Sequence, residues 1–168
     1  MNKKLETKDI AGYLPHELQA INNNGDTLHI PFNCVGGLFN GVKPAKPILR
    51  PLSDLFETIM HNGKEVIPIL ELARLSVPKY NWKLFLQKEY ERSHAFAESK
   101  GIEKIHFSYW NLNGSDMFTL LDNTGKNLCV PNQSKLFDYL LELKVDYRGL
   151  IDAGLAVSVY SLPENPYK

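Results

Sequence analysis

The sequence predicts an α+β fold, in which an N-terminal hairpin, a central meander and a C-terminal strand pack against several short helices and one longer helix. Short strand-like runs are separated by Asn-Gly and Asp-Asn-Thr-Gly turn signals. Runs of helical periodicity lie between them without the spacing of βαβ units. With 168 residues, 43% of them hydrophobic, the chain can bury a sizeable core. We expect a single domain over residues 1–168, with a core over 1–162 and a loose tail at 163–168.

The first elements are a short helix or turn and a hairpin. Residues 5–18 carry helical periodicity that Pro15 interrupts, because proline removes a backbone donor. Strands over 18–21 and 27–30 then flank an Asn-Gly turn. Residues 31–45 hold three glycines and two prolines, which predicts a loop or a weak edge strand near 35–39.

The most distinctive string runs from Lys46 to Leu55, Lys-Pro-Ile-Leu-Arg-Pro-Leu-Ser-Asp-Leu. Its two prolines favour extended backbone, so residues 45–50 should form a rigid, buried strap. A helix is expected from Ser53 to Met60, with Ser53 or Asp54 as N-cap and His61-Asn62-Gly63 at its end. Arg50, a lone cation in an apolar strap, should pair with Asp54 or Asp146.

The second half of the chain predicts alternating helical and extended segments. Val66-Ile67 reads as a strand that leads into a short helix over 68–75, which Pro68 can begin. Apolar residues at helical spacing predict the longest helix over 80–100, ended by Gly101. The remaining elements are a meander over 104–110, 117–121 and 127–130, a helix over 135–143, a helical turn over 147–154 and a strand over 155–160.

Charge and cysteine content narrow the function classes. Nineteen Lys and Arg balance nineteen Asp and Glu, which removes the usual electrostatic argument for a duplex-binding protein. Cys34 and Cys129 belong to no metal-type pair, and free buried thiols in a reducing compartment are expected, with one disulfide between them as the alternative. The N-terminal residues lack an apolar signal region, and no run is long enough for a membrane span. We expect a cytoplasmic protein.

No residue pattern indicates catalysis, a cofactor or a metal, and we predict no residues for these roles. The glycine string over 36–41 lacks the spacing of a phosphate-binding loop. The five histidines form no paired motif. A small hydrolase-like or metal-dependent enzyme would need at least two of four residues to converge in a pocket: His29, His106, Cys129 and Asp116.

Two groups of residues are candidates for a role in binding or structure. The candidate interaction surface consists of Phe39, Arg50, Tyr109 and Trp110, although core packing of helix on sheet is the alternative for the two aromatic residues on the expected strand. The candidate structural polar cluster consists of Arg50, Asp54, Asp146 and Arg148.

Four segments together resemble a family of small uncharacterised proteins of Bacteroides-type gut bacteria and their phages. They are Tyr13-Leu14-Pro15, the string from Lys46 to Leu55, His61-Asn62-Gly63, and Asp146-x-x-Gly-Leu-Ile151 followed by Gly154-Leu-Ala156. The resemblance implies a cytoplasmic protein carried on a prophage or other mobile DNA. Members of that family often carry Trp-His-Phe before the equivalent aspartate, where this chain has Leu143-Lys144-Val145.

The leading hypothesis is a non-enzymatic module that binds another protein. The first alternative is a nucleic-acid-binding accessory protein that uses a local basic patch, drawn from Lys43, Lys46 and Arg50 or from Lys83, Lys88 and Arg92. The enzyme described above is the third hypothesis.

Overall fold

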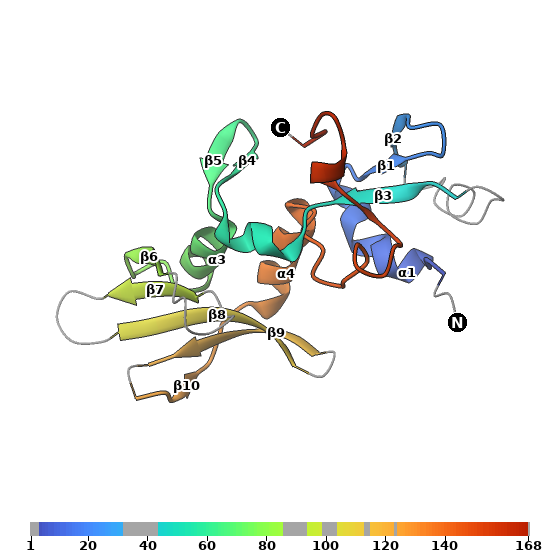
Figure 1. Ribbon diagram of the computed structural model, residues 1–168. Coiled ribbons are helices and arrows are strands. Elements are labelled where there is room, and N and C mark those ends of the chain that lie inside the picture. Colours follow the sequence, from blue (N-terminus) through green and yellow to red (C-terminus); the bar gives the residue numbers. More distant parts are fainter. Residues whose placement is uncertain are drawn as a thin grey trace. The chain divides into compact units, whose positions relative to one another are not determined.

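The computed structural model describes residues 4–31, 44–85, 94–98, 104–112, 115–122 and 124–167. Helices and antiparallel sheets together confirm the predicted α+β fold (Figure 1). The chain divides into two compact units, residues 1–52 with 140–168 and residues 53–139. We call them the terminal unit and the central unit and describe each by itself. The expectation of a single domain stays a prediction.

The terminal unit contains a four-stranded sheet. Two short helical segments, α1 (Thr7–Ile10) and the 3-10 helix η1 (Ala11–His16), precede it, with Pro15 inside η1 as expected. The sheet has the order β11-β3-β1-β2. Its strands are β1 (Gln19–Ile21), β2 (Thr27–His29), β3 (Lys46–Leu49) and β11 (Val157–Ser158).

The predicted N-terminal hairpin is confirmed. Strands β1 and β2 pair antiparallel, with Ala20 opposite Leu28. The Asn22 side-chain oxygen accepts hydrogen bonds from the amides of Asn24 and Asp26, and Gly25 adopts a φ of +88°. The side chain of Asn22 therefore closes the turn, while glycine supplies the left-handed backbone that the turn needs.

The predicted strap is also confirmed, as strand β3. The backbone over 46–49 is extended, and every residue from Pro47 to Arg50 is buried. Strand β3 lies between two neighbours: it pairs antiparallel with β1 and parallel with β11. The expected C-terminal strand is shorter than predicted, because β11 passes directly into the 3-10 helix η4 (Val159–Ser161).

The terminal unit buries one apolar cluster. Its residues come from both ends of the chain, which explains why residues 140–167 are needed to complete a core begun by residues 5–49. The buried members are Leu5, Ile10, Tyr13, Leu14, Leu18, Ala20, Ile30, Ala45, Leu49, Leu141, Leu150 and Ala156.

Residues 163–167, expected to form a loose tail, are held in place at Tyr167. The Tyr167 hydroxyl donates to the Ile48 carbonyl and accepts from the Gln19 amide, each at 2.9 Å. The Arg50 guanidinium donates to the Tyr167 carbonyl at 2.9 Å. Ordering this segment has an entropic cost, which these buried hydrogen bonds offset.

The predicted helix from Ser53 to Met60 is wrong. A 3-10 helix, η3 (Leu52–Phe56), is followed by a hairpin of β4 (Ile59–His61) and β5 (Lys64–Val66). Asn62 and Gly63 adopt φ values of +51° and +71°. Positive φ at both central residues is the type I′ geometry of a two-residue hairpin, so the Asn-Gly pair turns a hairpin instead of ending a helix.

The prediction of one long helix over 80–100 is also wrong. Residues Trp82–Phe85 form strand β6 and His94–Glu98 form strand β7, and the two pair antiparallel. Aromatic side chains such as Trp82 favour strands when a neighbouring strand and a buried face are available, and this tertiary context overrides the helical spacing. Residues 86–93 and 99–103 lie outside the described residues.

The central unit contains the five-stranded sheet with the order β10-β9-β8-β7-β6. Strands β8 (Lys104–Leu112), β9 (Ser115–Leu121) and β10 (Asn127–Leu128) confirm the predicted meander. The expected short helix is α3 (Pro68–Ser76), with Pro68 in its first turn. The expected helix near 135–143 is α4 (Gln133–Glu142), which crosses the boundary between the units.

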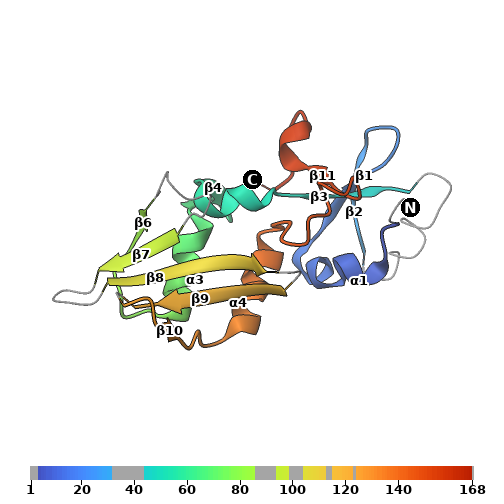
Figure 2. The same ribbon diagram turned by 60° about the horizontal axis from the view of Figure 1, so that its bottom comes forward.

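One face of the five-stranded sheet packs against helices, and we call it the inner face. Figure 2 shows α3 and the first part of α4 on the same side of β8 and β9. The Phe118 ring lies 5.5 Å from Phe107 and 5.2 Å from Phe137 of α4, measured between ring centroids. Trp82 contacts Phe107 edge to face at 6.0 Å. This aromatic row forms much of the core of the central unit.

Several predictions concern residues outside the described part of the chain. They are the loop or edge strand near 35–39, Phe39, Cys34, and the basic residues Lys43, Lys88 and Arg92.

Candidate functional site

The structure describes three of the four residues of the predicted interaction surface. Arg50 is buried, with 3% of its surface exposed. Phe39 lies outside the described residues. Tyr109 and Trp110 are adjacent on β8, so their side chains point to opposite faces of the sheet.

Tyr109 belongs to the inner face. Its ring lies 5.5 Å from Phe118, and its hydroxyl donates to an Asp116 carboxylate oxygen at 2.6 Å. Tyr109 therefore packs in the core between helix and sheet, which was the alternative to an exposed position in the interaction surface. Trp110 lies on the opposite face.

Two members of the predicted polar cluster lie together in the terminal unit. Arg50 and Asp146 are both buried in the terminal unit and are joined through the backbone: the Arg50 amide donates to Lys144, and the Asp146 amide donates to Arg50, each at 2.8 Å. Asp54 is buried in the central unit. Arg148 is exposed, donates to the Lys8 carbonyl at 2.7 Å and lies over the Tyr147 ring.

Asp146 acts as a buried cap for the turn that follows it. Its two carboxylate oxygens accept hydrogen bonds from the Leu150 amide at 2.9 Å and the Ile151 amide at 2.7 Å. A buried carboxylate with two backbone donors is a stable arrangement. The Asp-x-x-Gly-Leu-Ile string is therefore a structural motif in this chain.

Three of the segments that carry the family resemblance meet in the terminal unit. The Tyr13 hydroxyl donates to the Val145 carbonyl at 2.8 Å, and Arg50 forms a parallel bridge with Val145. Gly12 lies so close to α4 that an added Cβ would sit 2.7 Å from Leu141 Cδ1. The conspicuous strings therefore build the core of this unit.

The opposite side of the five-stranded sheet offers a candidate binding surface, which we call the outer face. Pairing of β8 with β9 places Trp110 opposite Met117, Ser108 opposite Thr119 and His106 opposite Leu121. These six residues alternate with the inner-face residues along both strands. Helix α3 and the first part of α4 lie on the other side of the sheet (Figure 2).

Along the middle of β8 and β9 the outer face carries no Lys, Arg, Asp or Glu: Trp110, Met117 and Leu121 are apolar, and Ser108, which is buried, Thr119 and His106 are polar. Met117 is 42% exposed, one of the most exposed large apolar side chains among the described residues. Trp110, His106, Thr119 and Leu121 are half-buried around it. The sequence could have predicted this face, because neighbouring residues of a strand point to opposite sides. Once residues 104–110 are taken as a strand, Trp110 and Tyr109 must lie on different faces of the sheet.

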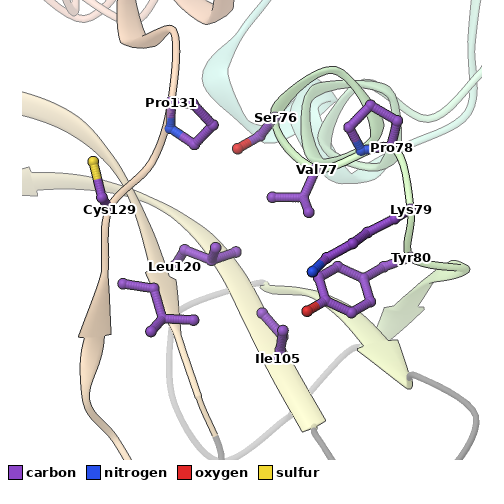
Figure 3. A pocket seen from close by; sticks show the side chains of 10 residues that line it. Ser76, Val77, Pro78, Lys79, Tyr80, Ile105, Leu120, Cys129 and Pro131 are labelled. Carbon is purple, nitrogen blue, oxygen red and sulfur yellow. The ribbon is translucent and has the colours of Figure 1, made fainter.

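A pocket lies within the central unit, between the inner face and the segment that follows α3 (Figure 3). Its volume is about 560 Å³, within the usual range for small-molecule sites. Most of its lining is apolar. The lining residues are Ser76, Val77, Pro78, Lys79, Tyr80, Ile105, Leu120, Leu128, Cys129 and Pro131.

The residues named for the enzyme hypothesis lie in different places. His29 belongs to the terminal unit, His106 to the outer face and Asp116 to the inner face, while Cys129 lines the pocket. Within the described ranges, no three His, Cys, Asp or Glu side chains are grouped as ligands for a metal ion. Nor is any described helix both long and apolar enough to span a membrane.

Comparisons with models of protein families, with curated proteins and with solved structures find no match to this chain.

Proposed function

We propose that this chain is a non-enzymatic interaction module whose outer face binds another protein. The observation that carries the proposal is the part of this face centred on Trp110 and Met117, which carries no Lys, Arg, Asp or Glu, with Met117 42% exposed. Methionine and tryptophan are enriched where proteins bind each other, and tryptophan is frequent among the residues that dominate binding energy.

The chemistry of this face favours a protein partner over a nucleic acid. Binding to a phosphate backbone requires lysine or arginine at the contact, and the six outer-face residues of β8 and β9 include neither. The register of β6, β7 and β8 places one exposed lysine, Lys83, on the same face at its β6 edge. An apolar partner surface would instead remove Met117 and the edge of Trp110 from water. A cytoplasmic role in a bacterium or its phage, which the family resemblance implies, is part of the same proposal.

The experiment compares two matched methionine variants in affinity capture from the lysate of a Bacteroides-type bacterium. Met117→Asp places a charge on the outer face, whereas Met60→Asp places one on β4 at a methionine that is similarly exposed, 40%. Burying an unpaired carboxylate in an apolar interface is costly. We expect a specific partner with the unmodified chain and with Met60→Asp, and its loss with Met117→Asp.

Circular dichroism and thermal unfolding would verify that both variants remain folded. Nuclease treatment of the lysate separates protein contacts from those bridged by nucleic acid. Equal capture by the two variants would contradict the proposal, and so would a captured set that disappears after nuclease treatment.

A further inference from the structure

The Tyr167 side chain occupies a site that the terminal unit builds around its hydroxyl group. The hydroxyl donates to the Ile48 carbonyl and accepts from the Gln19 amide, each at 2.9 Å. A group at this place must therefore donate one hydrogen bond and accept another. A hydroxyl does both, whereas a carboxylate only accepts and an ammonium group only donates. This end of the site is selective for a hydroxyl group.

The ring of Tyr167 contacts a cation. The Lys144 ammonium lies over the ring, 5.1 Å from its centroid, and such a contact favours an aromatic side chain over an aliphatic one. Lys144 adopts a φ of +60° at the left-handed position after α4, where glycine is common. Glycine would be less strained there, but it would leave the ring without this contact.

The backbone of Tyr167 is recognised as well. Arg50, which is 3% exposed, donates from its guanidinium to the Tyr167 carbonyl at 2.9 Å. The Tyr167 amide donates to the Asn165 side-chain oxygen at 2.9 Å, so the Asn-Pro-Tyr segment forms a turn of its own. Contacts to a hydroxyl, an aromatic ring and a peptide carbonyl together describe one kind of ligand, a tyrosine residue within a peptide.

The segment that carries Tyr167 lies at the surface and outside the sheet. Pro163 and Glu164 are exposed, and the four strands of the sheet all come from other parts of the chain. Segments of this kind open at a lower free-energy cost than core strands. Residues 163–167 are therefore well placed to leave the site and to be replaced.

We propose that the terminal unit holds a tyrosine-recognition site, which Tyr167 fills from within the chain and which accepts the tyrosine of a second peptide when residues 163–167 are displaced. The partner is a protein segment that carries an Asn-Pro-Tyr sequence like that of the chain itself. The chain's own tyrosine has a high effective concentration, so it keeps the site filled until such a segment competes with it. The outer face plays no part in this proposal.

The probe is the acetylated and amidated peptide Pro-Glu-Asn-Pro-Tyr, which has the sequence of residues 163–167. Its counterpart carries phenylalanine in place of tyrosine. Tyr167→Ala in the full chain vacates the site for the peptide side chain, and titration calorimetry and amide NMR shifts measure binding. We expect saturable binding of the tyrosine peptide to this variant with a Kd on the order of 1 mM or below. The shifts should centre on Gln19, Ile48 and Lys144.

Three comparisons define the specificity of the site. The phenylalanine peptide should bind Tyr167→Ala about tenfold more weakly, because it leaves the Gln19 amide and the Ile48 carbonyl without a partner. The unmodified chain should bind the tyrosine peptide more weakly still, because its own tyrosine must leave first. Tyr160→Ala, which removes a tyrosine of the same unit that is 62% exposed, should behave like the unmodified chain.

A second pair of variants tests the cation. In the Tyr167→Ala background, Lys144→Gln should lower the affinity for the tyrosine peptide about threefold, because it removes the charge over the ring. Lys8→Gln, at an exposed lysine of α1, should leave this affinity unchanged.

Circular dichroism would verify that Tyr167→Ala is folded. If it is not, Tyr167→Phe replaces it, because this variant keeps the ring and loses only the hydroxyl, and it should bind the tyrosine peptide more tightly than the unmodified chain does. The proposal is overturned by the absence of saturable binding to the folded variant or by equal affinities for the two peptides. Binding to Tyr160→Ala that is as tight as binding to the Tyr167 variant would overturn it as well.

Discussion

The Tyr167 hydroxyl lies between Gln19 of β1 and the Ile48 carbonyl of β3, and it forms a 2.9 Å hydrogen bond with each. Ala20 pairs with Pro47, so the antiparallel register places Gln19 opposite Ile48. The hydroxyl therefore takes the place of a direct bond between these strands. A side chain from residues 163–167 completes the centre of the four-stranded sheet.

Replacing Tyr167 with phenylalanine should destabilise the protein. The Gln19 amide and the Ile48 carbonyl would both lose a partner in a largely buried place, which costs about 1–3 kcal/mol in the free energy of unfolding. Urea denaturation measures this loss. Tyr160→Phe is the control, because Tyr160 is 62% exposed. Equal stability of the two variants would show that the Tyr167 bridge does not support the sheet.

The same hydroxyl predicts a loss of stability in alkali. Burial raises the pKa of Tyr167 above its ordinary value of 10. Below pH 10 the hydroxyl is protonated in both states. Above pH 10, Tyr167 ionises in the unfolded chain before it ionises in the folded protein. The stability that the Tyr167 hydroxyl contributes is therefore complete below about pH 10 and decreases as the pH rises toward the raised pKa of the folded state.

Unfolding free energies of the unmodified chain and of Tyr167→Phe, measured from about pH 8 to about pH 11, test this linkage. Their difference should shrink above pH 10, because only the unmodified chain carries the Tyr167 hydroxyl. A constant difference across this range would mean that Tyr167 ionises equally in the folded and unfolded states.

Asp146→Asn should destabilise the terminal unit. The carboxylate accepts from the Leu150 amide with one oxygen and from the Ile151 amide with the other. Asparagine replaces one of these oxygens with an NH2 group, which would face a backbone N–H donor instead of accepting from it. We expect a loss of about 1–3 kcal/mol at neutral pH. Asp152→Asn, at an exposed position of the same segment, should change stability by less than about 0.5 kcal/mol. Similar losses for the two variants would refute the capping role.

Gly12→Ala should cost about 1–3 kcal/mol, because the new methyl group would lie 2.7 Å from Leu141 Cδ1. A double-mutant cycle identifies the cause. In a Leu141→Ala background the clash is absent, so the same substitution should cost much less. If Gly12→Ala costs the same in both backgrounds, contact with Leu141 is not what disfavours a side chain at this position.

Local signals in the sequence were sufficient for several elements. Asn24-Gly25 identified the first hairpin, Pro68 the start of α3, and the prolines of the strap an extended segment. Each of these elements depends on the conformational preference of one or two residues, and that preference does not depend on the rest of the fold.

The remaining features depend on residues far apart in the chain. The segments that form β6 and β7 have apolar residues at helical spacing, which predicted a helix. They form strands because β8, a later part of the chain, supplies the neighbouring strand for β7 and the buried face on which Trp82 packs. Asn62-Gly63 was assigned to a helix end, although the pair fits a hairpin equally well. The role of Tyr167 follows from partners in β1 and β3 that no local pattern encodes.

A photo-crosslinking side chain at position 117 tests the proposed function most directly, with one at position 60 as its control. Both positions are occupied by methionines of similar exposure in the central unit. We predict one predominant cross-linked protein from position 117 in the bacterial lysate, absent from position 60 and lost when an excess of unlabelled chain competes. The same products from both positions, or no competable product from position 117, would contradict the assignment of the outer face as a protein-binding surface.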